Sequence, residues 1–252
     1  MRFSSKHVQP MPIGKLLKQS IKLGKQIFLL SLPSNILIII GTSSLAYLFY
    51  SYGLNLGVET TSLATIAIFN NLLFISVTGA NVFNLLLQNG QQKYLTIIKK
   101  SLWNTFKIIP TILVATLLYA ISVSMGLVLL IIPGLLLLGF FGLYTQVITL
   151  ESKGIVTSLT RSWQLVKGSL AKVFFSIFTI LLITNLMIIL LAVLGDGFIN
   201  KDHFWINISA DLLAYIFIMP FIGSFLALLY LDSRASQEAF DLTTLKEKTS
   251  TY

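Results

Sequence analysis

Charged side chains are scarce in this sequence, and cysteine is absent altogether. Lys, Arg, Asp and Glu make up 11 % of its 252 residues, against about 25 % in an average soluble domain. Without cysteine the chain has no disulfides and no thiolate ligands for a metal ion. This number of charged residues is too small to cover the surface of soluble domains of this total length. In addition, 55 % of the residues are hydrophobic. The composition therefore predicts a polytopic membrane protein with one integral membrane domain, residues 1–252.

Residues suited to catalysis are equally few. The two histidines, His7 and His203, lie near opposite ends of the chain, and no acidic residue is spaced with them as a metal site requires. The sequence has no glycine-rich phosphate loop, no nucleophile elbow and no His-Glu-x-x-His string. We therefore expect a protein that is not an enzyme and that uses no metal or cofactor.

Long apolar stretches dominate the rest of the chain. A helix needs about 20 apolar residues to cross the hydrocarbon core of a bilayer. Six segments reach roughly that length, with approximate bounds 26–51, 62–88, 109–131, 134–150, 173–195 and 207–231. Only Pro133-Gly134 separates the third from the fourth, because no charged residue lies between Ile108 and Leu150. Proline and glycine favour a break, so we expect a tight hairpin there.

The positions of Lys and Arg predict the orientation of these spans. Of the 18 Lys and Arg residues, 17 lie in the segments on one side of the membrane, and Lys201 alone lies on the other. Positively charged loops stay in the cytoplasm, so we expect both terminal segments, 1–25 and 232–252, to be cytoplasmic. The first apolar stretch is much longer than the apolar core of a signal peptide, about 7–15 residues, so we expect it to be retained as a span.

Three cytoplasmic segments combine an apolar face with a basic one at helical spacing. After the fourth span, one face holds Ile155, Leu159, Trp163, Val166 and Leu170, and the other holds Lys153, Thr157, Thr160, Gln164 and Lys167. Similar segments precede the first and third spans, and the strings KQSI, KKSLW and TRSW align on Ser20, Ser101 and Ser162. Either internal repetition or convergent patterning explains this similarity, and the sequence leaves both alternatives open. The predicted fold is all-α, with six transmembrane helices in three hairpins, each preceded by a basic amphipathic interfacial helix.

The cations of these segments are the candidate contacts with the lipid surface. An amphipathic helix lies in the membrane plane with its cations toward anionic headgroups, at about 1 kcal/mol for each Lys or Arg. The candidates are Lys15, Lys18, Lys22, Lys100, Lys107, Arg161, Lys167 and Lys172. A nucleic acid is not expected as a partner, because the cations are spread over three segments without an aromatic platform or a binding fold. We expect anionic lipids of the cytoplasmic leaflet instead.

The second span carries an unusual number of polar residues. Its candidate polar face consists of Asn70, Asn71, Thr78, Asn81, Asn84 and Gln88. Such side chains either bond to neighbouring helices, at about 0.6 kcal/mol each, or line a path or a site for a solute or a lipid headgroup. No ionisable residue joins this face, although ion coupling usually requires one. Helix packing is therefore the favoured interpretation, and transport is the alternative.

Two stretches of the chain resemble a known family. LESKGIVTSLTRSWQLVKGS at 150–169 carries an acidic residue, a Gly, a Ser on a basic helix and a Lys-Gly pair: Glu151, Gly154, Ser162, Lys167 and Gly168. LLYLDSRASQEAF at 228–240 ends the last span with a Tyr/Asp/Arg string. Both are similar to the membrane domain of the glycerophosphoryl diester phosphodiesterase superfamily, which includes the YciC-like bacterial inner-membrane proteins.

The resemblance implies six spans and a place in a bacterial inner membrane. It does not imply phosphodiesterase activity, because the sequence contains no soluble phosphodiesterase domain. The expected function is a non-enzymatic structural or interaction role in the bacterial envelope. The alternative is a transporter or lipid-translocating protein that uses the polar face of the second span.

Overall fold

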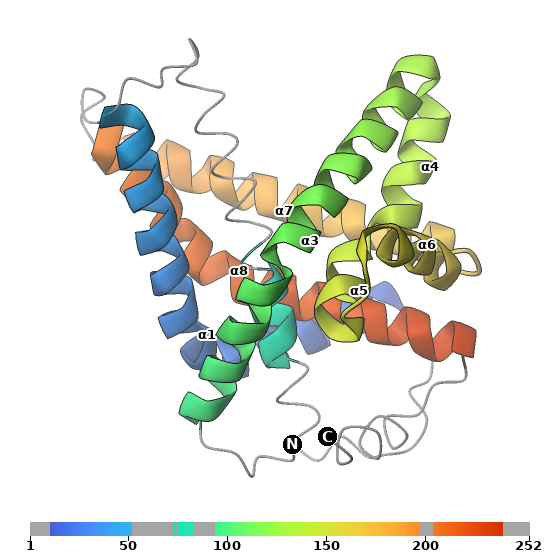
Figure 1. The fold of residues 1–252 in the computed structure, drawn as a ribbon, viewed down its shortest axis with the longest axis horizontal. Helices are drawn as coiled ribbons and strands as arrows, with labels where there is room; N and C mark the ends of the chain where they lie inside the picture. Colours follow the sequence, from blue (N-terminus) through green and yellow to red (C-terminus); the bar gives the residue numbers. More distant parts are fainter. Residues whose placement is uncertain (1–10, 52–72, 74, 83–93, 197–203, 239–252) are drawn as a thin grey trace.

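The computed structural model describes residues 11–51, 73, 75–82, 94–196 and 204–238, and all regular structure in this part of the chain is helical (Figure 1). Its helices are α1 (Ile13–Ser51), α3 (Tyr94–Leu129), α4 (Ile131–Phe141), α5 (Tyr144–Glu151), α6 (Ile155–Val166), α7 (Leu170–Asp196) and α8 (Phe204–Glu238). A further helical segment covers residues 75–82. The predicted all-α class is therefore confirmed.

Several helices have the length and composition that a membrane span requires. Four stretches of the described residues qualify: Ile13–Gly41, Ile98–Leu129, Ile131–Glu151 and Ile216–Gln237. They overlap the first, third, fourth and sixth predicted spans. α7 (Leu170–Asp196) covers the fifth predicted span. Most of the second predicted span lies outside the described residues, so the six-span arrangement stays a prediction.

Two helix pairs and a crossing helix make up the architecture. α1 packs mainly along α8, and α3 packs mainly along α4. In Figure 1 the α3–α4 pair rises at the upper right, and α7 passes behind α3 to contact both α4 and α8. α5 and α6 fill the corner between α3 and the end of α8. The main apolar core lies where α1, α7, α8 and residues 75–82 meet, around Ile27, Val82 and Phe225.

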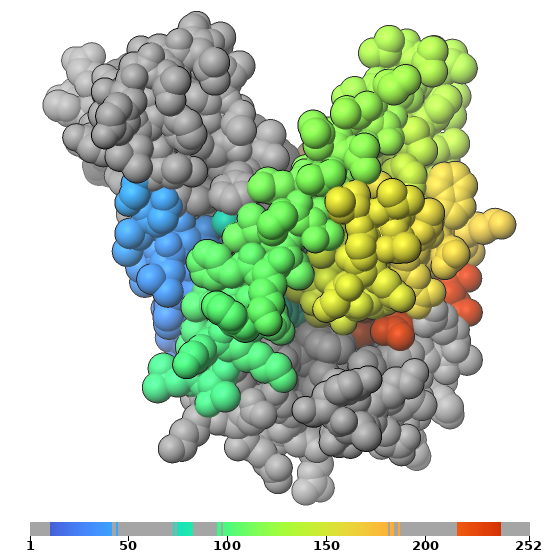
Figure 2. Space-filling model, in the orientation of Figure 1, coloured from blue at the N-terminus to red at the C-terminus, as the bar shows by residue number. Residues whose placement is uncertain are grey.

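The surface of the α3–α4 pair is apolar and open. Figure 2 shows the end of this pair projecting from the other described elements. There Val128 is 86 % exposed and Ile132 is 71 % exposed. Soluble proteins rarely expose a continuous apolar surface of this kind, whereas a surface that faces lipid requires one. The exposed side chains agree with a membrane protein.

The first two amphipathic segments differ from the prediction. α1 and α3 continue from the basic segment into the span as single helices of 39 and 36 residues, with Pro33 and Pro110 inside them. Only the third segment forms a helix of its own, α6, which the corner Lys167-Gly168-Ser169 separates from α7. The prediction of separate interfacial helices before the first and third spans was wrong. In α1 and α3 no turn interrupts the helix between the basic segment and the span. Between α6 and α7, in contrast, a turn that contains Gly168 interrupts it.

The hairpin between the third and fourth spans exists but turns a few residues earlier than expected. Leu130 alone is extended between α3 and α4 (φ −159°, ψ 137°). Pro133 falls in the first turn of α4, where a missing N–H breaks no helical hydrogen bond. Gly134 allows the two helices to approach, because a Cβ there would lie 2.6 Å from the backbone nitrogen of Leu127.

The fourth predicted span is two helices rather than one. α4 ends at Phe141 and α5 begins at Tyr144, with Gly142 and Leu143 between them. α7 passes close to this break, since a Cβ on Gly142 would lie 2.2 Å from Cδ1 of Ile177. A break between helices frees backbone N–H and C=O groups that need other partners. α6 supplies them.

Candidate functional site

The two stretches that carry the family resemblance lie against each other in the structure. The first forms the end of α5, all of α6 and the corner before α7, and the second forms the last turns of α8. Both α5 and α6 contact α8. Charged and hydroxyl side chains connect the two stretches and the helix that follows them. We call this set the polar junction: Glu151, Arg161, Lys172, Tyr230, Asp232 and Arg234.

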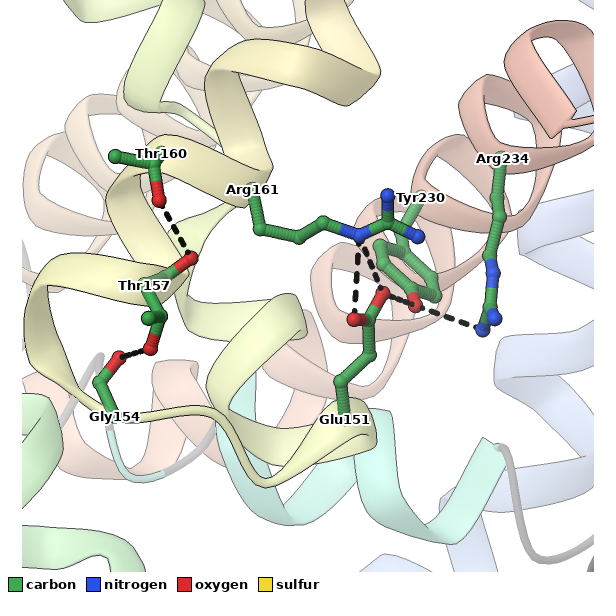
Figure 3. A network of polar contacts seen from close by, with 7 residues as sticks. All are labelled: Glu151, Gly154, Thr157, Thr160, Arg161, Tyr230 and Arg234. Carbon is green, nitrogen blue, oxygen red and sulfur yellow. Dashed lines mark hydrogen bonds and ion pairs between the residues drawn. The ribbon is translucent and has the colours of Figure 1, made fainter.

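Glu151 is the centre of one network in the polar junction (Figure 3). Its Oε1 accepts a 2.6 Å hydrogen bond from the Tyr230 hydroxyl. Both of its carboxylate oxygens accept from Arg161 Nε at 3.3 Å. Arg234 Nη1 donates in turn to the Tyr230 hydroxyl at 3.2 Å. The Glu151 side chain is only 10 % exposed, so this carboxylate joins α5, α6 and α8 from a nearly buried position.

The backbone after α5 explains how Arg161 reaches Glu151. Ser152 ends α5 in the left-handed conformation (φ 52°), which reverses the chain within a few residues. α6 then begins after Gly154, whose carbonyl accepts a 3.0 Å hydrogen bond from Thr157 Oγ1. Figure 3 shows Thr157 and Thr160 bonded along one side of α6, while Arg161 extends toward Glu151.

Asp232 forms the second part of the polar junction. Its side chain is 2 % exposed and pairs with Lys172 Nζ of α7. Its other oxygen accepts a 2.7 Å hydrogen bond from the backbone nitrogen of Met11. A buried charge left without its partner is strongly destabilising. One carboxylate on α8 therefore holds both α7 and Met11, which lies two residues before α1.

Ser162 forms hydrogen bonds with the backbone groups that are left free at the break between α4 and α5. Its hydroxyl donates to the carbonyl of Phe140 at 2.8 Å and accepts from the backbone N–H of Leu143 at 3.2 Å. Trp163 stacks on the Phe140 ring, with centroids 3.9 Å apart and planes inclined by 15°. α6 thus contacts both sides of the α4–α5 break through Ser162 and packs on α4 through Trp163. These contacts explain the presence of a serine in the middle of this helix.

The buried face of α6 differs from the predicted apolar face. It consists of Ser158, Leu159, Ser162, Leu165 and Val166. This face packs against helices of the same chain and not against lipid, because the serine hydroxyl finds its partners at the α4–α5 break. The aligned serines Ser20 and Ser101 are buried as well. All three amphipathic segments therefore turn their shared serine toward protein.

The candidate lipid contacts fall into two groups. Arg161 and Lys172 are partly buried in the ion pairs of the polar junction. The remaining candidates are exposed: Lys15, Lys18, Lys22, Lys100, Lys107 and Lys167. Lys107 Nζ lies 5.2 Å from the centroid of the Trp103 ring, within cation–π range. The role of these lysines in lipid binding stays a prediction.

Two residues of the predicted polar face lie in the described part of the chain. Thr78 and Asn81 are fully buried, and neither Thr78 Oγ1 nor the Asn81 amide has a hydrogen-bond partner. Thr78 packs on Gly223 of α8, where a Cβ would lie 2.5 Å from Thr78 Cβ. The other members lie outside the described residues: Asn70, Asn71, Asn84 and Gln88.

The sequence did not single out three residues that the structure makes prominent. Tyr230 and Asp232 were noted only as part of the family resemblance, because their partners lie far away in the chain. Gln146 of α5 is fully buried and its amide has no partner. One signal was available for it, since Gln146 is the only amide side chain between Ile108 and Leu150.

Among the residues that the structure describes, no three His, Asp or Glu side chains are grouped to hold a metal ion. Comparison of the chain with family models, with characterised proteins and with solved structures found no match. Function is therefore inferred from the geometry and the chemistry of the chain itself.

Proposed function

We propose that this chain is a non-enzymatic integral protein of a bacterial inner membrane, related to the YciC-like proteins. Six spans leave both termini in the cytoplasm, and its role in the envelope is structural or one of interaction. Its cytoplasmic side presents lysines that bind anionic lipid headgroups. The polar junction supports this role by holding the ends of α5, α6, α7 and α8 in a fixed arrangement.

The main support for lipid binding is the group of exposed lysines and aromatic side chains near the start of α3. Lys100 and Lys107 are exposed there beside Trp103 and Phe106, which are 62 % and 66 % exposed. Aromatic rings at headgroup depth with cations around them are typical of the interface between membrane and water. Neither lysine has a carboxylate partner among the described residues, so both charges are available to a phosphate group.

The orientation is tested with reporters that are active only in the cytoplasm. Fusion to the C-terminus should give signal, whereas insertion at Gly57 or at Asp202 should not. The reverse pattern would contradict the orientation and, with it, the placement of the basic side.

Lipid binding is tested on the purified full chain in a mild detergent. Anionic phosphatidylglycerol should raise the unfolding temperature more than zwitterionic phosphatidylcholine, because a ligand that binds only the folded state stabilises it. The double variant Lys100→Gln/Lys107→Gln should lose part of this difference, and salt should reduce it in the unaltered chain. The matched variant Lys100→Arg/Lys107→Arg keeps both charges and should retain it. Equal stabilisation by the two lipids would show that the lysines serve orientation alone.

A transporter or lipid-translocating protein is the second candidate, and the unpartnered side chains of Thr78 and Asn81 favour it. Membrane-buried polar groups without protein partners require a water-filled cavity. Single cysteines at these two positions, on a background without cysteine, should react with a water-soluble thiol reagent, while a cysteine at Ile75 should not. Absence of reaction at both positions would leave only the structural role.

A further inference from the structure

A second set of unpartnered polar groups lies between α5 and the helical segment 75–82. Gln146 of α5 is fully buried, and both its Oε1 and its Nε2 have no hydrogen-bond partner. Its amide rests against Gly79, where a Cβ would lie 2.6 Å from Oε1 and 3.2 Å from Nε2. Ser76 precedes Gly79 by three residues and therefore lies on the same face of that helix. Ser76 is also fully buried, and its Oγ has no partner.

Some other buried serines in this bundle avoid that situation by bonding to their own helix, whereas the hydroxyls of Ser34, Ser169, Ser176 and Ser233 are unpartnered like that of Ser76. Ser20 donates to the carbonyl of Leu17 at 2.7 Å, and Ser224 donates to that of Pro220 at 2.6 Å. Ser76 makes no such bond. A glutamine amide has two N–H donors and an oxygen with two lone pairs, and a hydroxyl adds one donor and two acceptor positions. Leaving all of them unsatisfied at this depth is costly.

We propose that ordered water occupies a site between α5 and residues 75–82, lined by Ser76, Gly79 and Gln146, which we call the interior polar site. Water satisfies buried donors and acceptors when a site offers two to four polar partners. Gly79 supports the assignment, because the absence of a side chain there is what brings the Gln146 amide onto this helix.

The interior polar site selects neutral, hydrogen-bonding molecules. Glu151 is the one acidic residue on α5, which has no basic residue, and its carboxylate is engaged by Arg161 and Tyr230. Residues 75–82 contain no ionisable side chain. A bare ion would find amide and hydroxyl dipoles but no counter-charge on these two elements, whereas water needs none. The proposal rests on neither the orientation of the chain nor its binding of lipid.

The test uses thiol hydrogen exchange, since the chain has no cysteine of its own. Ser76→Cys and Val77→Cys place a thiol at adjacent, fully buried positions, so burial is matched and only the facing groups differ. After transfer of the purified full chain into D2O, the infrared S–H band of Ser76→Cys should disappear at least about tenfold faster than that of Val77→Cys, because contact with internal water removes the need for a large opening. Adding Gln146→Leu should slow the exchange of Ser76→Cys toward the Val77→Cys rate.

Equal exchange rates for the two thiols would overturn the proposal and show a dry helix contact. If Ser76→Cys does not fold, the same comparison is made from the other side of the site. There Gln146→Cys should exchange faster than Val147→Cys, which is also fully buried. Equal rates in this pair would overturn the proposal in the same way.

Discussion

The polar junction and the interior polar site bury similar kinds of side chain in opposite ways. At the junction each carboxylate has partners on other helices: Glu151 meets Arg161 and Tyr230, and Asp232 meets Lys172. At the interior site Gln146 and Ser76 have none. A buried polar group with protein partners fixes the relative position of helices, whereas one without them requires another explanation, which at the interior polar site is the water proposed above. Burial alone therefore does not assign a role to a polar residue in this protein.

The comparison also separates the charged from the neutral polar groups. The carboxylates of the junction lie at helix ends, at Glu151 and near the end of α8. An unpaired charge costs far more than an unpaired amide when buried, so the charged residues are the ones that the fold must pair. Stability measurements should rank them accordingly.

Asp232→Ala should give the largest loss of stability. It leaves Lys172 and the Met11 N–H without their acceptor, and removing one member of a buried pair costs about 3–5 kcal/mol. Chemical denaturation of the purified protein in detergent measures the loss in the free energy of unfolding. The double replacement Lys172→Met/Asp232→Leu should cost less than Asp232→Leu alone, because no charge is then left behind. If Asp232→Ala lowers the free energy of unfolding by less than the substitution of an exposed lysine does, Asp232 does not stabilise the junction.

Tyr230→Phe should have the next largest effect. It removes one hydroxyl that donates to the Glu151 carboxylate and accepts from Arg234, and hydrogen bonds to charged groups contribute about 1.5–3 kcal/mol. Tyr144→Phe is the matched control, since the Tyr144 hydroxyl bonds only to the neutral hydroxyl of Thr116 at 2.7 Å. The same unfolding measurement should show a smaller loss for the control. Equal losses would mean that the charges of Glu151 and Arg234 add nothing to the hydrogen bonds of Tyr230.

Ser162→Ala should cost about 1 kcal/mol, as does removal of a side chain that caps a helix. The change leaves the Leu143 N–H and the Phe140 carbonyl unpartnered at the α4–α5 break. Thr160→Ala on the exposed side of the same helix should stay within about 0.5 kcal/mol of the unaltered chain. If both variants unfold at the same denaturant concentration, Ser162 does not stabilise the break.

Gln146→Leu should have the smallest effect of the four, about 0.6 kcal/mol, the average for a polar contact within a membrane bundle. The amide has no protein partner to leave behind, so its loss affects only bound water. Unfolding in detergent again provides the measurement. A loss as large as that of Tyr230→Phe would place a protein partner at Gln146 and erase the contrast between the two regions.

Particular residues show where sequence reasoning succeeded. The uncharged run from Ile108 to Leu150 was too long for a single span, and a hairpin was expected within it. The structure places the turn at Leu130. α6 was expected from its periodicity and forms a separate helix, although its buried face centres on Ser162 rather than on Trp163. Periodicity located the helix, and the partner at the α4–α5 break decided which side faces protein.

Local sequence was enough to predict the all-helical fold, the presence of helices long and apolar enough to cross a membrane, and the approximate position of most apolar helices that the structure describes. These properties follow from local composition and spacing, because a bilayer imposes length and apolarity on each segment separately. The pairing of the charged side chains, in contrast, depends on how the helices pack. Tyr230 lies 79 residues from Glu151, and Asp232 lies 60 residues from Lys172. A hydrogen bond depends on a separation of about 3 Å between atoms, and no local pattern encodes that distance between remote segments.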